Sequence, residues 1–225
     1  MIIIESLSKS YGSHKILNNI NLTFKKGTIN GIVGENGAGK TTLFKCISGL
    51  ENFEGAVDYN NKTLKNVTGY LATDLFFFSK MTGHEYLQLL CNARGINDSN
   101  IKESNLFNLP LNEYAENYST GMKKKLALTG LLIQKNEVYI LDEPFNGVDI
   151  HSNIIIQEIL LKLKQLDKIV IMASHIFSTL NESCDYLHYL KDGVIKNSVS
   201  KGNFEAIEND MKGDGIDSKL MDILT

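Results

Sequence analysis

Residues 34–41, Gly-Glu-Asn-Gly-Ala-Gly-Lys-Thr, have the composition and spacing of a loop that binds phosphate. They follow the apolar run 29–33, so the pattern predicts a buried strand, a glycine loop and a helix, with several backbone N–H groups directed at one anion. Lys40 can then reach the terminal phosphates, and the Thr41 hydroxyl can ligate Mg²⁺. This context favours a nucleoside triphosphate site over a glycine turn with a solvent-facing lysine. The expected nucleotide contacts here are Gly34, Asn36, Gly37, Ala38, Gly39, Lys40, Thr41 and Thr42.

Two consecutive carboxylates, Asp142 and Glu143, follow a second apolar run, residues 138–141, and precede Pro144. The run is typical of a buried parallel strand, and ligand sites in parallel sheets lie at the edge where the strands end. Asp142 is expected to hold the Mg²⁺ hydration shell, and Glu143 to deprotonate an attacking water as general base. Alone, these residues would equally describe a charged turn. Together with the glycine loop they predict hydrolysis of the triphosphate.

Residues 118–122, Tyr-Ser-Thr-Gly-Met, resemble the signature Leu-Ser-Gly-Gly-Gln of the ATP-binding subunits of ABC transporters. The resemblance covers nearly the whole chain, and the Tyr-Ser-x-Gly-Met form is similar to that of a drug- and polysaccharide-exporter branch. Ser119 is also a good N-cap for a helix over about 120–134, and spacing alone favours an ordinary capped helix. The family implies instead that Ser119 and Gly121 contact the nucleotide of a second subunit. It therefore implies a head-to-tail dimer that encloses two ATP molecules.

The resemblance also implies roles for three residues elsewhere in the chain. Asp149 corresponds to the carboxylate of the family's dimer-contacting loop, and Tyr11 to the aromatic side chain that stacks on adenine. His175 follows the apolar run 168–173 and matches the switch histidine that touches the γ-phosphate. Without the family, the histidine is typical of a satisfied polar residue and the tyrosine of a partly buried strand aromatic. The expected catalytic residues are Lys40, Glu143 and His175.

Thr73 departs from the family pattern, which usually has glutamine or glutamate at this position. In relatives that side chain approaches Mg²⁺ and links the site to the membrane partner. Either the Thr73 hydroxyl or the neighbouring Asp74 substitutes for it, or the coupling to the partner is weaker here; the sequence leaves both open. The expected metal contacts are Thr41, Asp142 and Thr73.

The elements around these motifs indicate an α/β fold of the P-loop NTPase type, with a mainly parallel sheet and a helical subdomain insert. The resemblance adds a small antiparallel β region near the start. We expect a single domain over residues 1–225. Residues 1–75 and 135–200 would form its core, 76–134 the helical subdomain with the signature, and 201–225 a short C-terminal tail.

Composition and missing motifs disfavour several other classes of protein. A net charge of −3 and a pI of about 6.0 are a poor match to a protein that neutralises many nucleic-acid phosphates. Arg94 is the only arginine among 23 basic residues, which disfavours a nucleotide kinase with an arginine-rich lid. An Asn-Lys-x-Asp motif for guanine is absent late in the chain, so ATP is favoured over GTP. The isolated cysteines, Cys46, Cys91 and Cys184, favour a reducing compartment over a disulfide or zinc framework.

Apolar runs and charge runs bear on localisation. The longest apolar run falls well short of the roughly 20 residues that cross a bilayer, and the N-terminus has no basic leader pattern. We therefore expect a cytoplasmic chain that reaches the cell membrane peripherally through a permease. The aromatic run 76–78 would either contact that permease or pack inward beneath the helical subdomain. The lysines at 123–125 would either touch lipid headgroups or form a solvated helix face, and the solvated face is the preferred interpretation.

The sequence favours an ATP-hydrolysing subunit that dimerises around ATP, with itself or with another ABC ATPase subunit, and drives a membrane permease. Export is the preferred direction because the signature resembles that of exporters. Two alternatives stay open: a soluble ABC ATPase acting on cytosolic machinery, and a weakly hydrolysing ATP-binding half of a heterodimer. Thr73 and the altered signature agree with the second alternative, whereas Glu143 and His175 argue against it.

Overall fold

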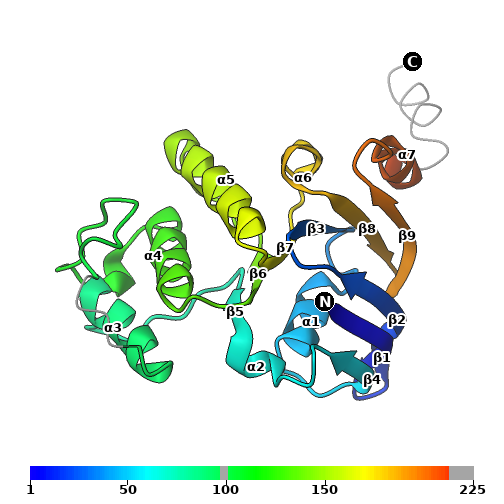
Figure 1. The fold of residues 1–225 in the computed structure, drawn as a ribbon, viewed down its shortest axis with the longest axis horizontal. Helices are drawn as coiled ribbons and strands as arrows, with labels where there is room; N and C mark the ends of the chain where they lie inside the picture. Colours follow the sequence, from blue (N-terminus) through cyan, green and yellow to red (C-terminus); the bar gives the residue numbers. More distant parts are fainter. Residues whose placement is uncertain (97–100, 213–225) are drawn as a thin grey trace.

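The computed structural model describes residues 1–96 and 101–212, and a mostly parallel sheet forms its centre (Figure 1). In this part of the chain, the six strands of that sheet have the order β5-β6-β7-β3-β8-β9. All neighbouring pairs are parallel except β8 and β9, which are antiparallel. The strands are β3 (Thr28–Val33), β5 (Thr68–Leu71), β6 (Val138–Asp142), β7 (Ile169–Ala173), β8 (Tyr186–Lys191) and β9 (Val194–Ser200).

Helices cover both faces of this sheet, which explains why every residue of β6 and β7 is buried. On one face, α5 (Ile150–Gln165) and α6 (Phe177–Ser183) pack against alternate strand residues such as Tyr139 and Met172. On the other face, α1 (Lys40–Ile47) packs against the intervening residues, such as Ile140. The apolar runs that predict buried strands are therefore apolar because each strand has a core on both sides.

A second sheet, of three strands in the order β2-β1-β4, lies over α1 (Figure 1). Its strands, all antiparallel to their neighbours, are β1 (Ile2–Tyr11), β2 (His14–Phe24) and β4 (Glu54–Asp58). Apolar residues of β1 and β2 share one core with α1. The predicted antiparallel region is thus present, and it closes the core around the helix that follows the glycine loop.

The helices between β5 and β6 form a lobe beside the main sheet (Figure 1). It contains α3 (Gly83–Ala93), the short 3₁₀ helix η1 (Ala115–Asn117) and α4 (Thr120–Ile133). A capping box between Thr82 and Glu85 begins α3, and Ser119 caps α4. The lobe has an apolar core of its own, which includes Leu87, Cys91 and Leu126.

The predicted fold class is confirmed, including the helical insert in an α/β core. The division at residues 75, 134 and 200 stays a prediction, and the tail beyond residue 212 lies outside the described residues. The remaining helices are α2 (Leu64–Val67) and α7 (Glu205–Lys212). Across the described ranges, no helix is long and apolar enough to span a bilayer.

Strand register brings the predicted site residues to one edge of the sheet. Ile32 of β3 pairs with Ala173 of β7, and Ala173 pairs with Asp142 of β6. Since all three strands are parallel, their carboxyl ends lie level. The segments that follow β3, β6 and β7 carry the glycine loop, Glu143 and His175, so these groups meet at that edge.

Candidate active site

The loop between β3 and α1 has a backbone path that depends on its glycines. Gly37 and Gly39 have φ angles of +85° and +107°, in the left-handed region that side chains disfavour. A Cβ on Gly34 would lie 2.2 Å from the carbonyl oxygen of Leu190 in β8. The loop therefore passes too close to the sheet for any larger residue at position 34. It borders a cavity of about 370 Å³, lined by Asn36, Gly37, Gly39, Lys40, Thr41, Thr42, Lys45, Tyr70, Ala72, Thr73, Asp74, Asp142 and Glu143.

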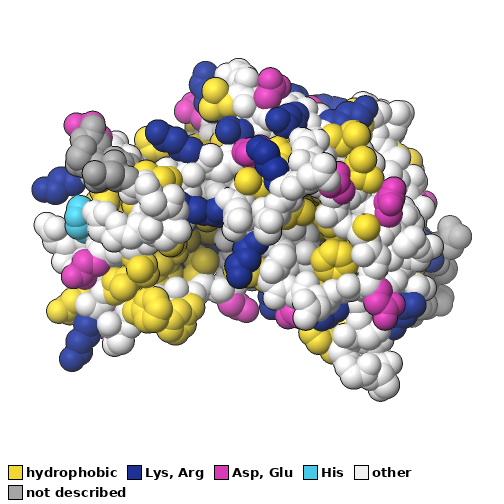
Figure 2. Space-filling model, turned by 60° about the horizontal axis from the view of Figure 1, so that its bottom comes forward, with side chains coloured by type: hydrophobic (Ala, Val, Ile, Leu, Met, Phe, Trp, Pro, Cys, Tyr) yellow, Lys and Arg dark blue, Asp and Glu magenta, His cyan; other side chains and the backbone are white. Residues whose placement is uncertain are grey.

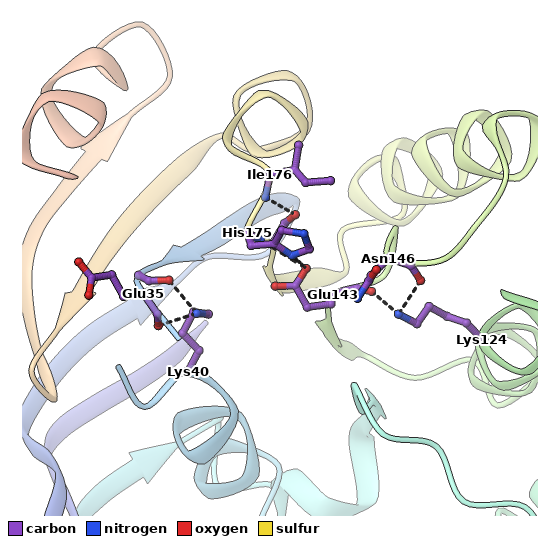
Figure 3. Close-up of polar contacts among 9 residues, drawn as sticks. Glu35, Lys40, Lys124, Glu143, Asn146, His175 and Ile176 are labelled. Carbon is purple, nitrogen blue, oxygen red and sulfur yellow. Dashed lines mark hydrogen bonds and ion pairs between the residues drawn. The ribbon is translucent and has the colours of Figure 1, made fainter. Parts of the chain in front are cut away.

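Lys40, the first residue of α1, is held by the loop itself (Figure 3). Its Nζ donates to the carbonyl oxygens of Gly34 at 2.7 Å and Glu35 at 3.0 Å. Burial lowers the pKa of Lys40, and the carboxylates of Glu143 and Asp142 act in the opposite direction. The ammonium group is thus fixed over the loop at the start of a helix, where both the charge and the helix N-terminus favour an anion.

Thr41 and Asp142 lie side by side although 101 positions separate them. The Thr41 hydroxyl donates to Asp142 Oδ2 at 2.6 Å, and Asp142 is buried at the end of β6. Nearby on β5, the Tyr70 hydroxyl is buried and has no hydrogen-bond partner among the described residues, and its pKa is raised by burial and by Asp142 and Asp74. Buried polar atoms normally have a hydrogen-bond partner. The Tyr70 hydroxyl lines the same cavity as Thr41 and Asp142, so this part of the cavity is suited to a polar ligand.

This donor set fits Mg²⁺. Mg²⁺ is commonly bound by one or two protein oxygens, with water and phosphate oxygens completing its shell. Thr41 and Asp142 supply such oxygens in the cavity beside the glycine loop. Within the described residues, no group of three or more His, Cys, Asp or Glu side chains could hold a metal without further ligands. The Thr41 and Asp142 oxygens fit a Mg²⁺ ion whose remaining ligands are water and phosphate oxygens.

Glu143 and His175, predicted from separate segments, are in contact (Figure 3). His175 Nδ1 lies 2.8 Å from Glu143 Oε2, and the His175 backbone N–H donates to the same oxygen at 3.3 Å. Glu143 lines the cavity beside the glycine loop, whereas His175 lines an adjoining cavity of about 250 Å³ together with Gly34. The glutamate is therefore oriented from β7 and faces the phosphate loop.

The signature residues lie apart from these groups. Ser119 caps α4 and accepts from the Met122 N–H at 3.2 Å, and a Cβ on Gly121 would lie 2.4 Å from the Gly147 carbonyl oxygen. Asp149 caps α5 and is paired with Lys125 at 3.1 Å. Hydrogen bonds from the Ser152 N–H and hydroxyl and from Lys125 hold the pKa of Asp149 well below its usual range. Ser119, Gly121 and Asp149 are outside the residues that line the Lys40 cavity.

Tyr11 and the residues after β5 have distinct environments. Tyr11 is exposed at the end of β1, with the Lys9 ammonium 4.6 Å from its ring centroid.

Thr73 and Asp74 both line the cavity beside the glycine loop. Both candidates for the position that is usually glutamine or glutamate in the family are therefore adjacent to Lys40 and Thr41. Phe77 packs against Tyr86, at 4.7 Å between ring centroids.

The two neighbours of Phe77 point outward instead. Phe76 and Phe78 are 75% and 52% exposed and contact each other edge to face. Figure 2 shows hydrophobic side chains gathered on the lobe that carries α3 and α4. The run 76–78 is therefore divided between the two predicted roles: one ring packs inward and two are available to a partner.

The interpretation of residues 123–125 as a solvated face was wrong for Lys124 and Lys125. Lys124 is only 2% exposed, and its Nζ donates to backbone carbonyl oxygens of Glu143 and Asn146. Lys125 is bound to Asp149. Four buried residues lie three or four positions apart, on one face of the helix: Gly121, Lys124, Leu128 and Leu131. This spacing predicts a buried helix face, whereas the charges of the lysines favoured a solvated one.

Comparisons with known proteins identify the family of this chain. A family model described as "ABC transporter" matches residues 17–146, more than half of the chain. The chain therefore belongs to the ABC transporter family. The prediction of an ATPase of this family is thereby confirmed.

Individual relatives align over most of the chain. The bacitracin transport ATP-binding protein BcrA of Enterococcus faecalis is 32% identical, over 99% of this chain and 78% of that protein. The lantibiotic transport ATP-binding protein SrtF of Streptococcus pyogenes is 29% identical over 93% of each. A solved ATP-binding subunit of an ABC transporter superimposes with a TM-score of 0.85 at 23% identity and full coverage of both chains, which supports the fold.

Proposed function

We propose that this chain binds ATP with Mg²⁺, dimerises around it and uses its hydrolysis to drive a membrane permease, with export as the direction. The observation that carries the proposal is the convergence of Lys40, the Thr41–Asp142 pair and Glu143 around one cavity. BcrA and SrtF are named as transport ATP-binding proteins, which supports a role in transport. The chain itself would lie peripherally on the cytoplasmic face of the membrane.

The glycine loop and the start of α1 bind the phosphates through backbone N–H groups, and the Lys40 ammonium neutralises charge on the terminal ones. Thr41 Oγ1 and Asp142 would hold Mg²⁺, which when bound supplies positive charge to the phosphate oxygens. Thr73 or Asp74 would add a polar contact at the same wall of the cavity. These groups stabilise the charge that develops as the γ-phosphoryl group is transferred.

Glu143 acts as the general base in this proposal. Its carboxylate accepts a proton from water, the water oxygen bonds to the γ-phosphorus, and the bond to the bridging oxygen of ADP breaks. His175 orients the carboxylate through the 2.8 Å contact and lies where it can sense the γ-phosphate. Lys40 stays bonded to the loop and holds the phosphates in line.

A second subunit would complete the site. Ser119 Oγ accepts from the Met122 N–H, so its hydroxyl proton is available to donate to a phosphate oxygen of a facing subunit. Gly121 and Asp149 would contribute to the same interface, while Tyr11 would stack on adenine within its own subunit. Ser119 and Gly121 lie outside the Lys40 cavity of their own subunit, which supports their assignment to the nucleotide of the partner. That partner is a second copy or another ABC ATPase subunit.

The test is steady-state ATP hydrolysis by wild type and Glu143→Gln, with ATP binding measured in parallel. Loss of the general base predicts a rate lowered by about 10²- to 10⁴-fold with ATP still bound. Glu158→Gln, an exposed glutamate on α5, is the matched control and should keep the wild-type rate. Equal low rates in wild type and Glu143→Gln would instead support the ATP-binding half of a heterodimer.

A further inference from the structure

We propose that Lys124 is a positioning residue for hydrolysis: its buried ammonium group fixes the backbone of Glu143 and makes the orientation of that base depend on helix α4. The inference rests on the proposed function, because it concerns the base of the same reaction. Lys124 has no contact with the phosphate cavity and acts through Glu143.

Two hydrogen bonds carry the proposal (Figure 3). Lys124 Nζ donates to the Glu143 carbonyl oxygen at 2.6 Å and to the Asn146 carbonyl oxygen at 3.0 Å. These two carbonyls belong to the segment that turns from β6 toward α5, and the Asn146 N–H also donates to the Glu143 carbonyl at 3.2 Å. One cation from the helical lobe therefore holds both ends of the turn that begins with Glu143.

Burial of the Lys124 ammonium group costs free energy, and the two hydrogen bonds to the Glu143 and Asn146 carbonyls offset that cost. An ammonium group removed from water loses its hydration, and burial lowers the pKa of Lys124, with Glu143 and Asp142 opposing the shift. A lysine that only packed could extend its charge to solvent along its flexible stem. Lys124 instead ends on two main-chain carbonyls, which indicates a positional role for the charge.

The backbone of Glu143 needs such support. Its φ angle is +54°, in the left-handed region that a residue with a Cβ rarely adopts and that surrounding contacts must maintain. Its N–H donates to the Ala173 carbonyl at 3.0 Å, so β7 holds one side of the residue and Lys124 the other. This backbone directs the carboxylate to His175.

The hydrogen bond from Lys124 to the Glu143 carbonyl also connects the proposed base, Glu143, to the signature segment 118–122. Lys124 lies just over one turn into α4, the helix that Ser119 caps. Because the helix is a rigid element, a displacement of its start displaces the ammonium group and the Glu143 carbonyl with it. Glu143 is therefore aligned only when α4 is in the position described here.

The experiment compares Lys124→Met, which keeps the length of the side chain without charge or donors, with Lys124→Arg and an exposed control, Lys196→Met on β9. We expect Lys124→Met to lower kcat about 10²-fold, the order that a small misplacement of a catalytic group costs. The Kd for ATP should stay within about twofold, because the phosphate contacts are intact. Lys124→Arg should recover part of the rate, and Lys196→Met should match wild type.

Hydrogen exchange gives a readout that needs no turnover. In nucleotide-free protein, amides of the peptide 142–147 should exchange faster in Lys124→Met than in wild type or Lys196→Met. In a Glu143→Gln background, Lys124→Met should lower the residual rate no further, since both changes remove the same function. Lys124→Gln, which keeps an amide donor, repeats the comparison with a smaller perturbation.

Three results would overturn the inference: unchanged kcat in Lys124→Met, a loss of ATP affinity equal to the loss of kcat, or a full additional loss in the Glu143→Gln background. An inactive wild type would reject the proposed function instead. The exchange comparison then still decides whether Lys124 holds the 143–146 turn.

Discussion

Gly34→Ala is the substitution whose cost can be worked out most directly from the structure. The added Cβ would lie 2.2 Å from the Leu190 carbonyl oxygen and 3.2 Å from the Ala38 Cβ. Leu190 is fully buried in β8, within the sheet, so its carbonyl cannot move aside cheaply. The glycine loop must therefore shift by about 1 Å, since contacts below about 3 Å are not tolerated in packed interiors.

Overpacking against backbone costs about 3 kcal/mol of unfolding free energy. Gly12→Ala is the matched control: Gly12 has φ +59°, but its added Cβ would meet no atom of the described residues within 4 Å. That change brings only the left-handed strain of an L residue, about 1 kcal/mol. Both substitutions add one methyl group. The unfolding free energy of Gly34→Ala should therefore be lower than that of Gly12→Ala by about 2 kcal/mol, because a steric clash costs more than backbone strain.

Urea unfolding of wild type and both variants measures the difference. Gly34→Ala should also lose ATP affinity, because Lys40 Nζ bonds the Gly34 carbonyl and moves with the loop. A Gly34→Ala protein no less stable than Gly12→Ala, with wild-type ATP affinity, would refute the close approach of the loop to β8.

Two further predictions concern pH and docking. Burial lowers the pKa of His188 to about 4, so between that value and the ordinary 6.5 the unfolded chain binds the extra proton and stability falls as the pH falls. We expect a loss of about 2 kcal/mol from this group between pH 7 and pH 5, and His188→Asn should flatten that part of the urea-unfolding profile. Phe76→Asp should reduce co-purification with a permease while ATP binding is kept, because Phe76 is 75% exposed whereas Phe77 is packed. Leu50→Asp, at an exposed leucine elsewhere, is its control, and equal co-purification of both variants with the permease would exclude docking through Phe76.

The proposed catalytic groups of this protein lie in short sequence motifs, and the register of the parallel strands brings these motifs together. Residues 34–41 form one continuous segment, the glycine loop and the start of α1, so their types and spacing alone predict a phosphate cradle. Asp142 and His175 follow apolar runs, and parallel strands end at a common edge, so their approach to the loop could also be predicted. The family resemblance supplied the roles of Ser119 and Asp149, which capping patterns alone would not.

Tertiary packing determines the burial and the backbone conformation of residues whose neighbours come from other segments. Lys124 is buried because the face of α4 that carries it meets the 143–146 turn, and no local pattern encodes the position of two distant carbonyls. Phe77 is partly buried and packs against Tyr86, whereas Phe76 is 75% exposed. The left-handed backbone of Glu143 likewise depends on β7 and α4 together. Sequence alone therefore predicted the groups to which a chemical role is proposed. Packing determined their orientation, because orientation depends on contacts between segments far apart in the chain.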